Sequence, residues 1–183
     1  MRIDETTGLL DSALFIESPN QDDRPDGEPI SLLVIHNISL PPDEFGGPYI
    51  EQLFTNSLNP TEHPFFESIK DLRVSAHLLI RRDGSMIQFV PFHKRAWHAG
   101  VSQFCGREKC NDFSIGIEME GTDTQAYEPI QYKKLAEVTQ LILKVYPEIT
   151  LENIQGHCDI APQRKTDPGE AFDWTYYKSM LIT

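Results

Sequence analysis

Cysteine is scarce in this sequence of 183 residues, which contains only Cys105, Cys110 and Cys158. An odd number of cysteines without paired C-x-x-C spacing fits neither a disulfide framework nor a closed cysteine zinc site. We therefore expect a protein of a reducing compartment, which favours a cytoplasmic location.

Long apolar runs are also missing. No stretch approaches the roughly 18 uninterrupted apolar residues that a membrane-crossing helix requires. Near the N-terminus, Asp4, Glu5 and Asp11 lie where a secretion signal needs a basic region and then an unbroken apolar one. The sequence thus predicts no membrane association and no secretion signal.

Positive charge is in the minority, with 16 Lys and Arg against 28 Asp and Glu and a formal net charge of −12 at pH 7. The basic residues are scattered, and short clusters occur only at Arg81-Arg82 and at residues 93–95. Because binding to duplex nucleic acid requires a concentrated basic face, we expect no nucleic-acid partner.

Short apolar segments predict strands. Residues 30–36 form a β-rich apolar run that suits a buried strand, and residues 113–121 form a second one. Segments 74–82 and 85–92 flank Asp83-Gly84, a strong two-residue turn signal, and predict a hairpin.

The clearest predicted helix covers residues 128–146, where apolar residues recur at near-helical spacing. Pro129 suits its first turn and Pro147 closes it. Shorter helices are expected within residues 49–71 and 171–182.

Strands interleaved with helices predict an α/β (α+β) fold, with a central mixed sheet flanked by helices in a single domain. We expect residues 1–29 to form an N-terminal lead-in, irregular over residues 17–29, and residues 30–183 to form the domain. Composition agrees, since 39% of the residues are hydrophobic and 24% are charged.

Two histidines and one aspartate suggest a metal site. His36 ends an apolar strand, His157 opens a polar loop, and Asp167 lies ten positions later on that loop. Two imidazoles and a carboxylate are a ligand set of catalytic zinc sites, which keep a fourth position open. The alternative remains open, since a histidine at a strand end is often only a hydrogen-bonding residue, and Asp167 also begins an ordinary turn.

Glu118 lies among apolar neighbours in the segment 113–121, where burying a carboxylate is costly unless it is paired or functional. It is a candidate general base for a metal-activated water. Lys165 is a candidate for stabilising an oxyanion. In the other reading, Glu118 and Lys165 are simply solvated. Gly116 marks a point of close approach by backbone or ligand.

A covalent mechanism is less well supported. Cys158 adjoins His157, but neighbours in sequence usually point in different directions, so an inert thiol is the simpler interpretation. No G-x-S-x-G motif is present for a serine hydrolase.

Five ordered blocks resemble the N-acetylmuramoyl-L-alanine amidases of the AmpD type. They are HNISLPPDEFGG (36–47), LRVSAHLLIRRDG (72–84), RAWHAGVS (95–102), NDFSIGIEMEGTD (111–123) and GHCDIAPQRKTDPG (156–169). The resemblance implies a zinc hydrolase that cleaves the amide between (1,6-anhydro-)N-acetylmuramic acid and L-alanine of small muropeptides during cell-wall recycling. It also implies an indirect effect on β-lactamase induction.

The resemblance assigns a role to each candidate residue. It implies zinc ligands at His36, His157 and Asp167, an acid/base residue at Glu118 and an oxyanion-stabilising residue at Lys165. It also implies substrate contacts, at Asn37, Arg73, His98 and Arg107. The two arginines could hold peptide carboxylates or form surface ion pairs.

Three other functions remain as alternatives. A binding module of the related peptidoglycan-recognition group would lack a metal ligand, whereas the set here is complete. A secreted amidase acting on intact cell wall would need a signal. A sensor of cell-wall fragments would bind tightly and turn over slowly.

Overall fold

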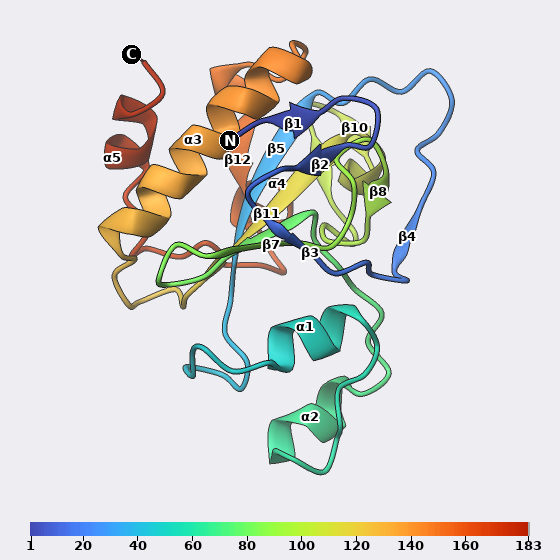
Figure 1. Cartoon of the computed structure of the whole chain (residues 1–183), viewed down its shortest axis with the longest axis vertical. Coiled ribbons are helices and arrows are strands. Elements are labelled where there is room, and N and C mark those ends of the chain that lie inside the picture. The colour runs from blue at the N-terminus through green and yellow to red at the C-terminus, as the bar shows by residue number, and fades with distance from the viewer. Residues whose placement is uncertain (183) are drawn as a thin grey trace.

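The structure, a computed structural model, describes residues 1–182 and is built around one mixed sheet (Figure 1). Its six strands are, in spatial order, β12 (Ile154–Gly156), β5 (Leu32–Ile38), β11 (Ser114–Glu120), β6 (Leu78–Ile80), β7 (Met86–Gln88) and β3 (Leu14–Phe15). The only antiparallel neighbours in this sheet are β6 and β7; the other four pairs are parallel. The predicted mixed sheet is confirmed.

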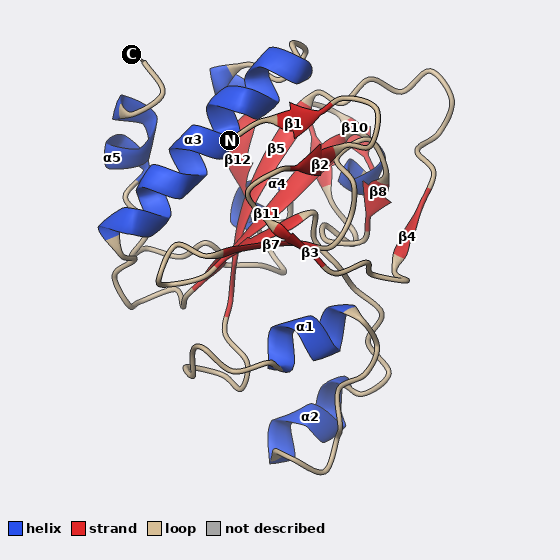
Figure 2. Cartoon of the chain, in the orientation of Figure 1, coloured by secondary structure: helices blue, strands red, loops and turns tan. Residues whose placement is uncertain are grey.

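Helices cover the sheet and extend beyond it (Figure 2). α3 (Pro129–Val145) crosses one face with α5 (Trp174–Ser179) beside it, whereas α1 (Tyr49–Phe54) and α2 (Pro64–Ile69) belong to a segment that projects from the sheet. The short α4 (His157–Ile160) follows β12 directly, and two 3-10 turns lie at Cys110–Asp112 and Leu151–Asn153. The predicted helices within 49–71 are therefore confirmed as α1 and α2.

Side chains of the two central strands alternate between the faces of the sheet, as the β period of two requires. On the face covered by α3, the core contains Leu33, Ile35, Ile115, Ile117 and Met119. The opposite face carries His36 and Glu118, which are register partners on β5 and β11. One pair of strands thus supplies both the core and a row of chemically active side chains.

Helix α3 agrees with its prediction because its signals are local. It begins at Pro129, and the Gln131 side chain accepts a hydrogen bond from the Glu128 amide at 3.0 Å, which caps the first turn. Leu135, Val138 and Ile142 are fully buried against the sheet.

The predicted hairpin exists but is shorter than expected. β6 and β7 contain three residues each, and Gly84 has the positive φ of +82° that the tight turn needs. Pairing stops early because the chain before β6 turns to other partners: the Ser75 amide donates to the Trp97 carbonyl at 3.1 Å. The final helix, α5, is likewise shorter than the predicted 171–182.

Residues 1–29 contain four two-residue strands, three of them β1 (Ile3–Asp4), β2 (Leu9–Leu10) and β4 (Gln21–Asp22). β1 pairs with β2, and β4 pairs with β8 (Arg95–Ala96). Ile3 and Leu10 are buried in the main core. This segment therefore packs on the fold, and the boundary at residue 30 stays a prediction. The remaining short strands are β9 (Gln103–Phe104) and β10 (Arg107–Glu108).

No helix among residues 1–182 has both the length and the apolar character that crossing a bilayer demands.

Candidate metal centre

Three donor atoms from separate elements converge on one point. His36 comes from β5, His157 begins α4, and Asp167 lies on the loop that follows α4. His36 Nδ1 is 3.0 Å from His157 Nδ1 and 3.0 Å from Asp167 Oδ2, and His157 Nδ1 is 3.1 Å from Asp167 Oδ2. The donor atoms form a nearly equilateral triangle.

The triangle fits a tetrahedral zinc site. Bonds of about 2.0–2.1 Å place neighbouring ligands of a tetrahedron about 3.3 Å apart, close to the observed spacing. The donor set of two nitrogens and one carboxylate oxygen is chemically suitable, and it leaves a fourth position for water or substrate. Among residues 1–182, this is the group of His, Cys, Asp and Glu side chains with the geometry to hold a metal ion.

The outward-facing ring nitrogens of both histidines are held as well. His36 Nε2 lies 2.9 Å from His98 Nδ1, and His157 Nε2 lies 3.1 Å from the Ala99 carbonyl oxygen. Such partners fix the orientation of metal-binding imidazoles.

Metal binding needs a neutral imidazole and an ionised carboxylate, and the surroundings of His36 and Asp167 favour these states. Burial lowers the pKa of His36 to about 4, although the neighbouring Asp167 carboxylate opposes this shift, so its imidazole is neutral at pH 7. Burial disfavours the charged form of Asp167, but the neighbouring imidazoles of His157 and His36 outweigh it and hold the pKa of this carboxyl well below its usual range.

Glu118 lies beside the triangle, on the strand next to His36. It is buried, and its Oε2 atom has no hydrogen-bond partner among the described residues. Burial, with Asp167 nearby, raises the pKa of Glu118 well above its ordinary value, whereas Lys165 opposes the shift. An unpaired buried carboxylate of raised pKa is suited to accepting a proton.

Lys165 is half-buried on the same loop as Asp167. Within residues 1–182, no hydrogen bond or ion pair holds its Nζ atom, so the ammonium group is available to a ligand. Its charge acts on both Glu118 and His36.

All these side chains line one cleft of about 620 Å³, between the face of the sheet and the segment that carries α1. Asn37 also lines it and uses its amide hydrogens on Asp123 Oδ1, at 2.8 Å, and on the Pro168 carbonyl, at 3.0 Å. The Asn37 amide oxygen is therefore the atom left to meet a ligand.

The other predicted substrate contacts differ in their position relative to the cleft. Arg73 is exposed next to the cleft residues Leu72 and Val74, and it donates to the carbonyls of Lys70 and Leu72. His98 lines the cleft, but both of its ring nitrogens already have partners.

Arg107 is not among the residues that line the cleft. It pairs with Glu28, donates to Ser31 Oγ at 3.0 Å, and its guanidinium carbon lies 3.7 Å from the centre of the Phe113 ring. In this arrangement it forms the ion pair that the sequence left as the other possibility.

Cys158 follows the candidate ligand His157, but burial and nearby carboxylates raise the pKa of its thiol. This shift is opposite to the one that activates a thiol nucleophile. All three cysteines are free.

Residues around His98 were not identified from the sequence. They are Ala99, whose carbonyl holds His157; Asn111, whose Oδ1 accepts from the amides of His98 and Ala99 at 3.1 and 2.7 Å; and Ser114, 3.1 Å from His98 Nε2. The signal that could have found them is Gly116, where the sequence predicted a close approach by backbone or ligand, whereas the group that approaches is the His98 side chain.

Comparison with known proteins agrees with this site. A sequence model of the N-acetylmuramoyl-L-alanine amidase family matches residues 26–170. The chain is 62% identical to the 1,6-anhydro-N-acetylmuramyl-L-alanine amidase AmpD of Escherichia coli (strain K12), over 95% of this chain and 94% of that protein.

Solved structures give the same result. A crystal structure of a selenomethionine derivative of AmpD, 59% identical, superposes with a TM-score of 0.95 and covers 99% of each chain. The amidase AmiD from Escherichia coli, solved with the substrate anhydro-N-acetylmuramic acid-L-Ala-D-γ-Glu-L-Lys, is 30% identical with a TM-score of 0.61. That match covers 87% of this chain and 60% of AmiD. On the family match, the identity and the shared fold, the chain belongs to the N-acetylmuramoyl-L-alanine amidases and is an amidase.

Proposed function

We propose that this amidase is a zinc-dependent hydrolase of muropeptides, which cleaves the amide between 1,6-anhydro-N-acetylmuramic acid and L-alanine in cell-wall recycling. The observation that carries the proposal is the triangle of donor atoms, 3.0–3.1 Å on each side, in the cleft that also contains Glu118 and Lys165.

His36, His157 and Asp167 would hold the zinc ion. When bound, zinc supplies Lewis-acid polarisation of a water and of the scissile carbonyl. Nitrogen and carboxylate donors in a tetrahedral arrangement favour zinc among the common divalent ions.

Glu118 acts as the general base and then as the general acid. Its carboxylate, which lines the cleft, accepts a proton from the attacking water as the new carbon–oxygen bond forms. The same carboxyl then delivers that proton to the alanine nitrogen as the carbon–nitrogen bond breaks. The products are a lactyl carboxylate and a free peptide amine.

Lys165 stabilises the negative charge that develops on the carbonyl oxygen. Its ammonium group has no other described partner, so no existing bond is lost when the substrate arrives. The partial burial of Lys165 strengthens this interaction relative to one in bulk water.

Substrate class follows from the cleft and the relatives together. The relatives named above act on or bind anhydromuramyl peptides according to their names. A cleft of about 620 Å³ has room for a sugar with a short peptide. Asn37 would accept a hydrogen bond from the substrate through its amide oxygen, and Arg73, at the rim, would meet a peptide carboxylate. Arg107 would reach the substrate only after leaving Glu28.

We also propose a cytoplasmic location, which suits the three free cysteines and a substrate that is a soluble turnover fragment. Through the level of such fragments, the enzyme would influence β-lactamase induction indirectly.

The test is mass spectrometry of the zinc-loaded protein incubated with an anhydromuramyl tripeptide. We expect free tripeptide and anhydro-muramic acid, loss of this activity after chelation, and its recovery on addition of zinc. Intact substrate with folded, zinc-loaded protein would contradict the proposed activity. Full activity after verified metal removal would contradict the role of zinc.

A further inference from the structure

A chain of hydrogen bonds runs from the metal triangle into the fold through His98. His36 Nε2 lies 2.9 Å from His98 Nδ1, and His98 Nε2 lies 3.1 Å from Ser114 Oγ. The chain ends at a main-chain group, because Ser114 Oγ donates to the Cys110 carbonyl oxygen at 2.6 Å.

The last bond determines the direction of the others. A carbonyl oxygen only accepts, so the single hydroxyl hydrogen of Ser114 points to Cys110. Ser114 Oγ must then accept from His98, which places the hydrogen of a neutral His98 ring on Nε2 and leaves a lone pair on Nδ1. That lone pair accepts from His36 Nε2. The hydrogen of His36 is thus held away from the metal triangle, and its Nδ1 turns a lone pair toward the triangle.

His98 is built into this position. A Cβ atom at Gly116 would lie 2.5 Å from Cγ and Nδ1 of the His98 ring, so only a glycine leaves room for the ring on β11. The His98 and Ala99 amides both donate to Asn111 Oδ1. The same fixed pair of residues therefore holds both histidine ligands, through the His98 ring and the Ala99 carbonyl.

We infer that His98 is a positioning residue of the metal centre, which together with Ser114 sets the tautomer of His36 that presents Nδ1 to the ion. The inference rests on the proposed metal-binding role of His36. It also replaces the predicted substrate contact at His98, because neither ring nitrogen is free to meet a substrate.

Zinc affinity tests the inference without relying on turnover. Protein stripped of metal would be titrated with zinc in competition with a chromophoric chelator, for the wild type, Ser114→Ala and Ser114→Thr. Removing a group bonded directly to a metal ligand typically weakens metal binding by about 10- to 100-fold. Ser114 acts through His98, one bond further away, so we expect a loss near the lower end of that range, about tenfold, for Ser114→Ala. The hydroxyl of Ser114→Thr should restore most of the affinity.

Ser102→Ala is the matched control. Ser102 is a buried serine of the same region whose hydroxyl donates to the Gly100 carbonyl and accepts from the Cys110 amide, but is bonded to neither His98 nor a metal donor, so the variant should bind zinc like the wild type. Folded Ser114→Ala protein with wild-type zinc affinity would overturn the inference.

A second measurement needs neither a variant nor a metal. Nitrogen-15 chemical shifts of the imidazoles in zinc-free wild-type protein distinguish the two tautomers, and we expect hydrogen on Nε2 of both His98 and His36. Hydrogen on His98 Nδ1 would overturn the inference. Wild-type protein that binds no zinc would instead contradict the proposed function, and the tautomers would still test the hydrogen-bond chain.

Discussion

Among single residues, Glu118 combines burial with an oxygen atom that accepts no hydrogen bond from any described group. Glu118→Gln keeps the size of the side chain but removes its ability to accept a proton. We expect turnover to fall by about 10²- to 10⁴-fold. Zinc content and the thermal midpoint should change little, since Glu118 is not one of the three donors.

Steady-state kinetics and metal analysis of the same Glu118→Gln preparation check this prediction. A loss of zinc in parallel with activity would mean that Glu118 supports the metal and not the proton transfer.

Lys165 differs from Glu118 because its contribution would be made only to a developing charge. Lys165→Ala should lower kcat by about 10²- to 10³-fold, as removal of an oxyanion donor does, with much less effect on KM. Lys133→Ala, at an exposed lysine of α3, serves as the control for loss of one positive charge. Equal losses in the two variants would show that net charge, and not position, is responsible.

The sequence predicts which individual side chains are candidates for chemistry, but it does not predict the residues that hold them in place. His36 and Glu118 stood out because polar groups in apolar strands are unusual. His98 and Ala99 lie in a loop and Asn111 lies in a three-residue 3-10 turn, and neither segment has a periodic pattern. Only the folded chain therefore shows that they hold the two candidate histidine ligands.

Helix α1 is attached to the sheet by charged groups. Arg81 donates to Glu120 Oε1 at 2.9 Å, to both oxygens of Glu51 at 2.5 and 2.6 Å, and to the Gly47 carbonyl at 2.9 Å. Glu120 Oε1 also accepts from the Gly46 amide at 2.7 Å. This network fixes one wall of the cleft relative to β11.

Glu51→Gln removes one charge from the network. We expect a loss of about 1–3 kcal/mol in the free energy of unfolding, because the half-buried Arg81 keeps one carboxylate fewer. Relative to the wild type, amide hydrogen exchange should accelerate in α1 and stay unchanged in α3. Denaturant unfolding and amide exchange measure both effects.

The matched control for that change is Glu67→Gln, which breaks the exposed pair between Glu67 and Lys70. Exposed pairs contribute little, so this variant should unfold like the wild type. Similar destabilisation of the two variants would mean that the Arg81 network has no special role.

Elements with strong local signals were predictable, and those that depend on distant contacts were not. α3 has a proline start and helical apolar spacing, and β11 is a seven-residue buried strand. The strands of residues 1–29 have two residues each, too few for any periodicity, and they form where β7, β8 and the core lie beside them.

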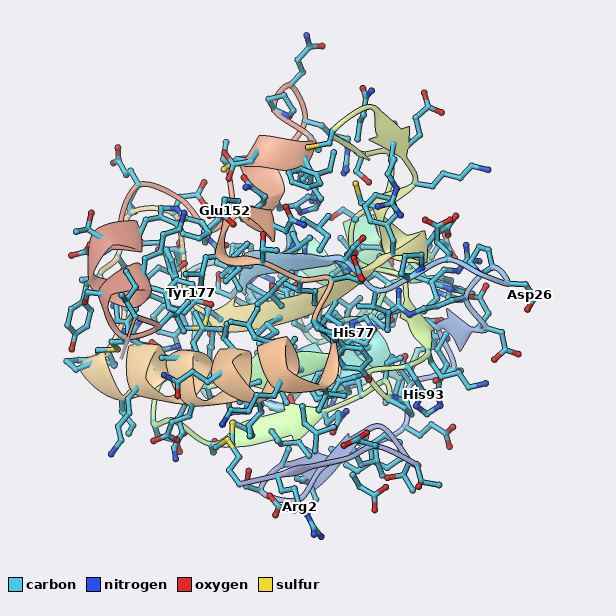
Figure 3. All side chains as sticks on the ribbon, turned by 90° about the horizontal axis from the view of Figure 1, so that it is seen from above. Arg2, Asp26, His77, His93, Glu152 and Tyr177 are labelled. Atoms are coloured by element: carbon cyan, nitrogen blue, oxygen red, sulfur yellow. The ribbon has the colours of Figure 1, made fainter. Side chains whose placement is uncertain are left out.

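On the scale of the whole molecule, a half-buried cation from the N-terminal segment, Arg24, joins several parts of the fold. Arg24 donates to the carbonyls of Phe92, Asn111, Asp112 and Ser114, and its Nη2 lies 3.2 Å from His77 Nε2. Figure 3 shows His77 in the interior of the molecule. Burial, and then the charge of Arg24, lower the pKa of His77 to about 3.

This arrangement predicts sensitivity to acid. The unfolded chain takes up a proton on His77 near its ordinary pKa of 6.5, whereas the folded chain does so only near 3. The stabilisation is therefore complete above pH 6.5 and is lost progressively as the pH falls toward 3. Urea unfolding at pH 7, 6 and 5 should show a shallower decline for His77→Gln than for the wild type. Parallel declines would assign the acid sensitivity to other groups.

Along β5 and β11, core side chains and site side chains alternate, so the strand register that builds the core also builds the site. A slip of one residue in either strand would turn its imidazole or carboxylate toward α3 and bring isoleucines into the cleft. A misaligned chain would then lose its core and its metal donors in one step. The free energy that favours the correctly packed core therefore also favours the strand register in which the site residues face the cleft.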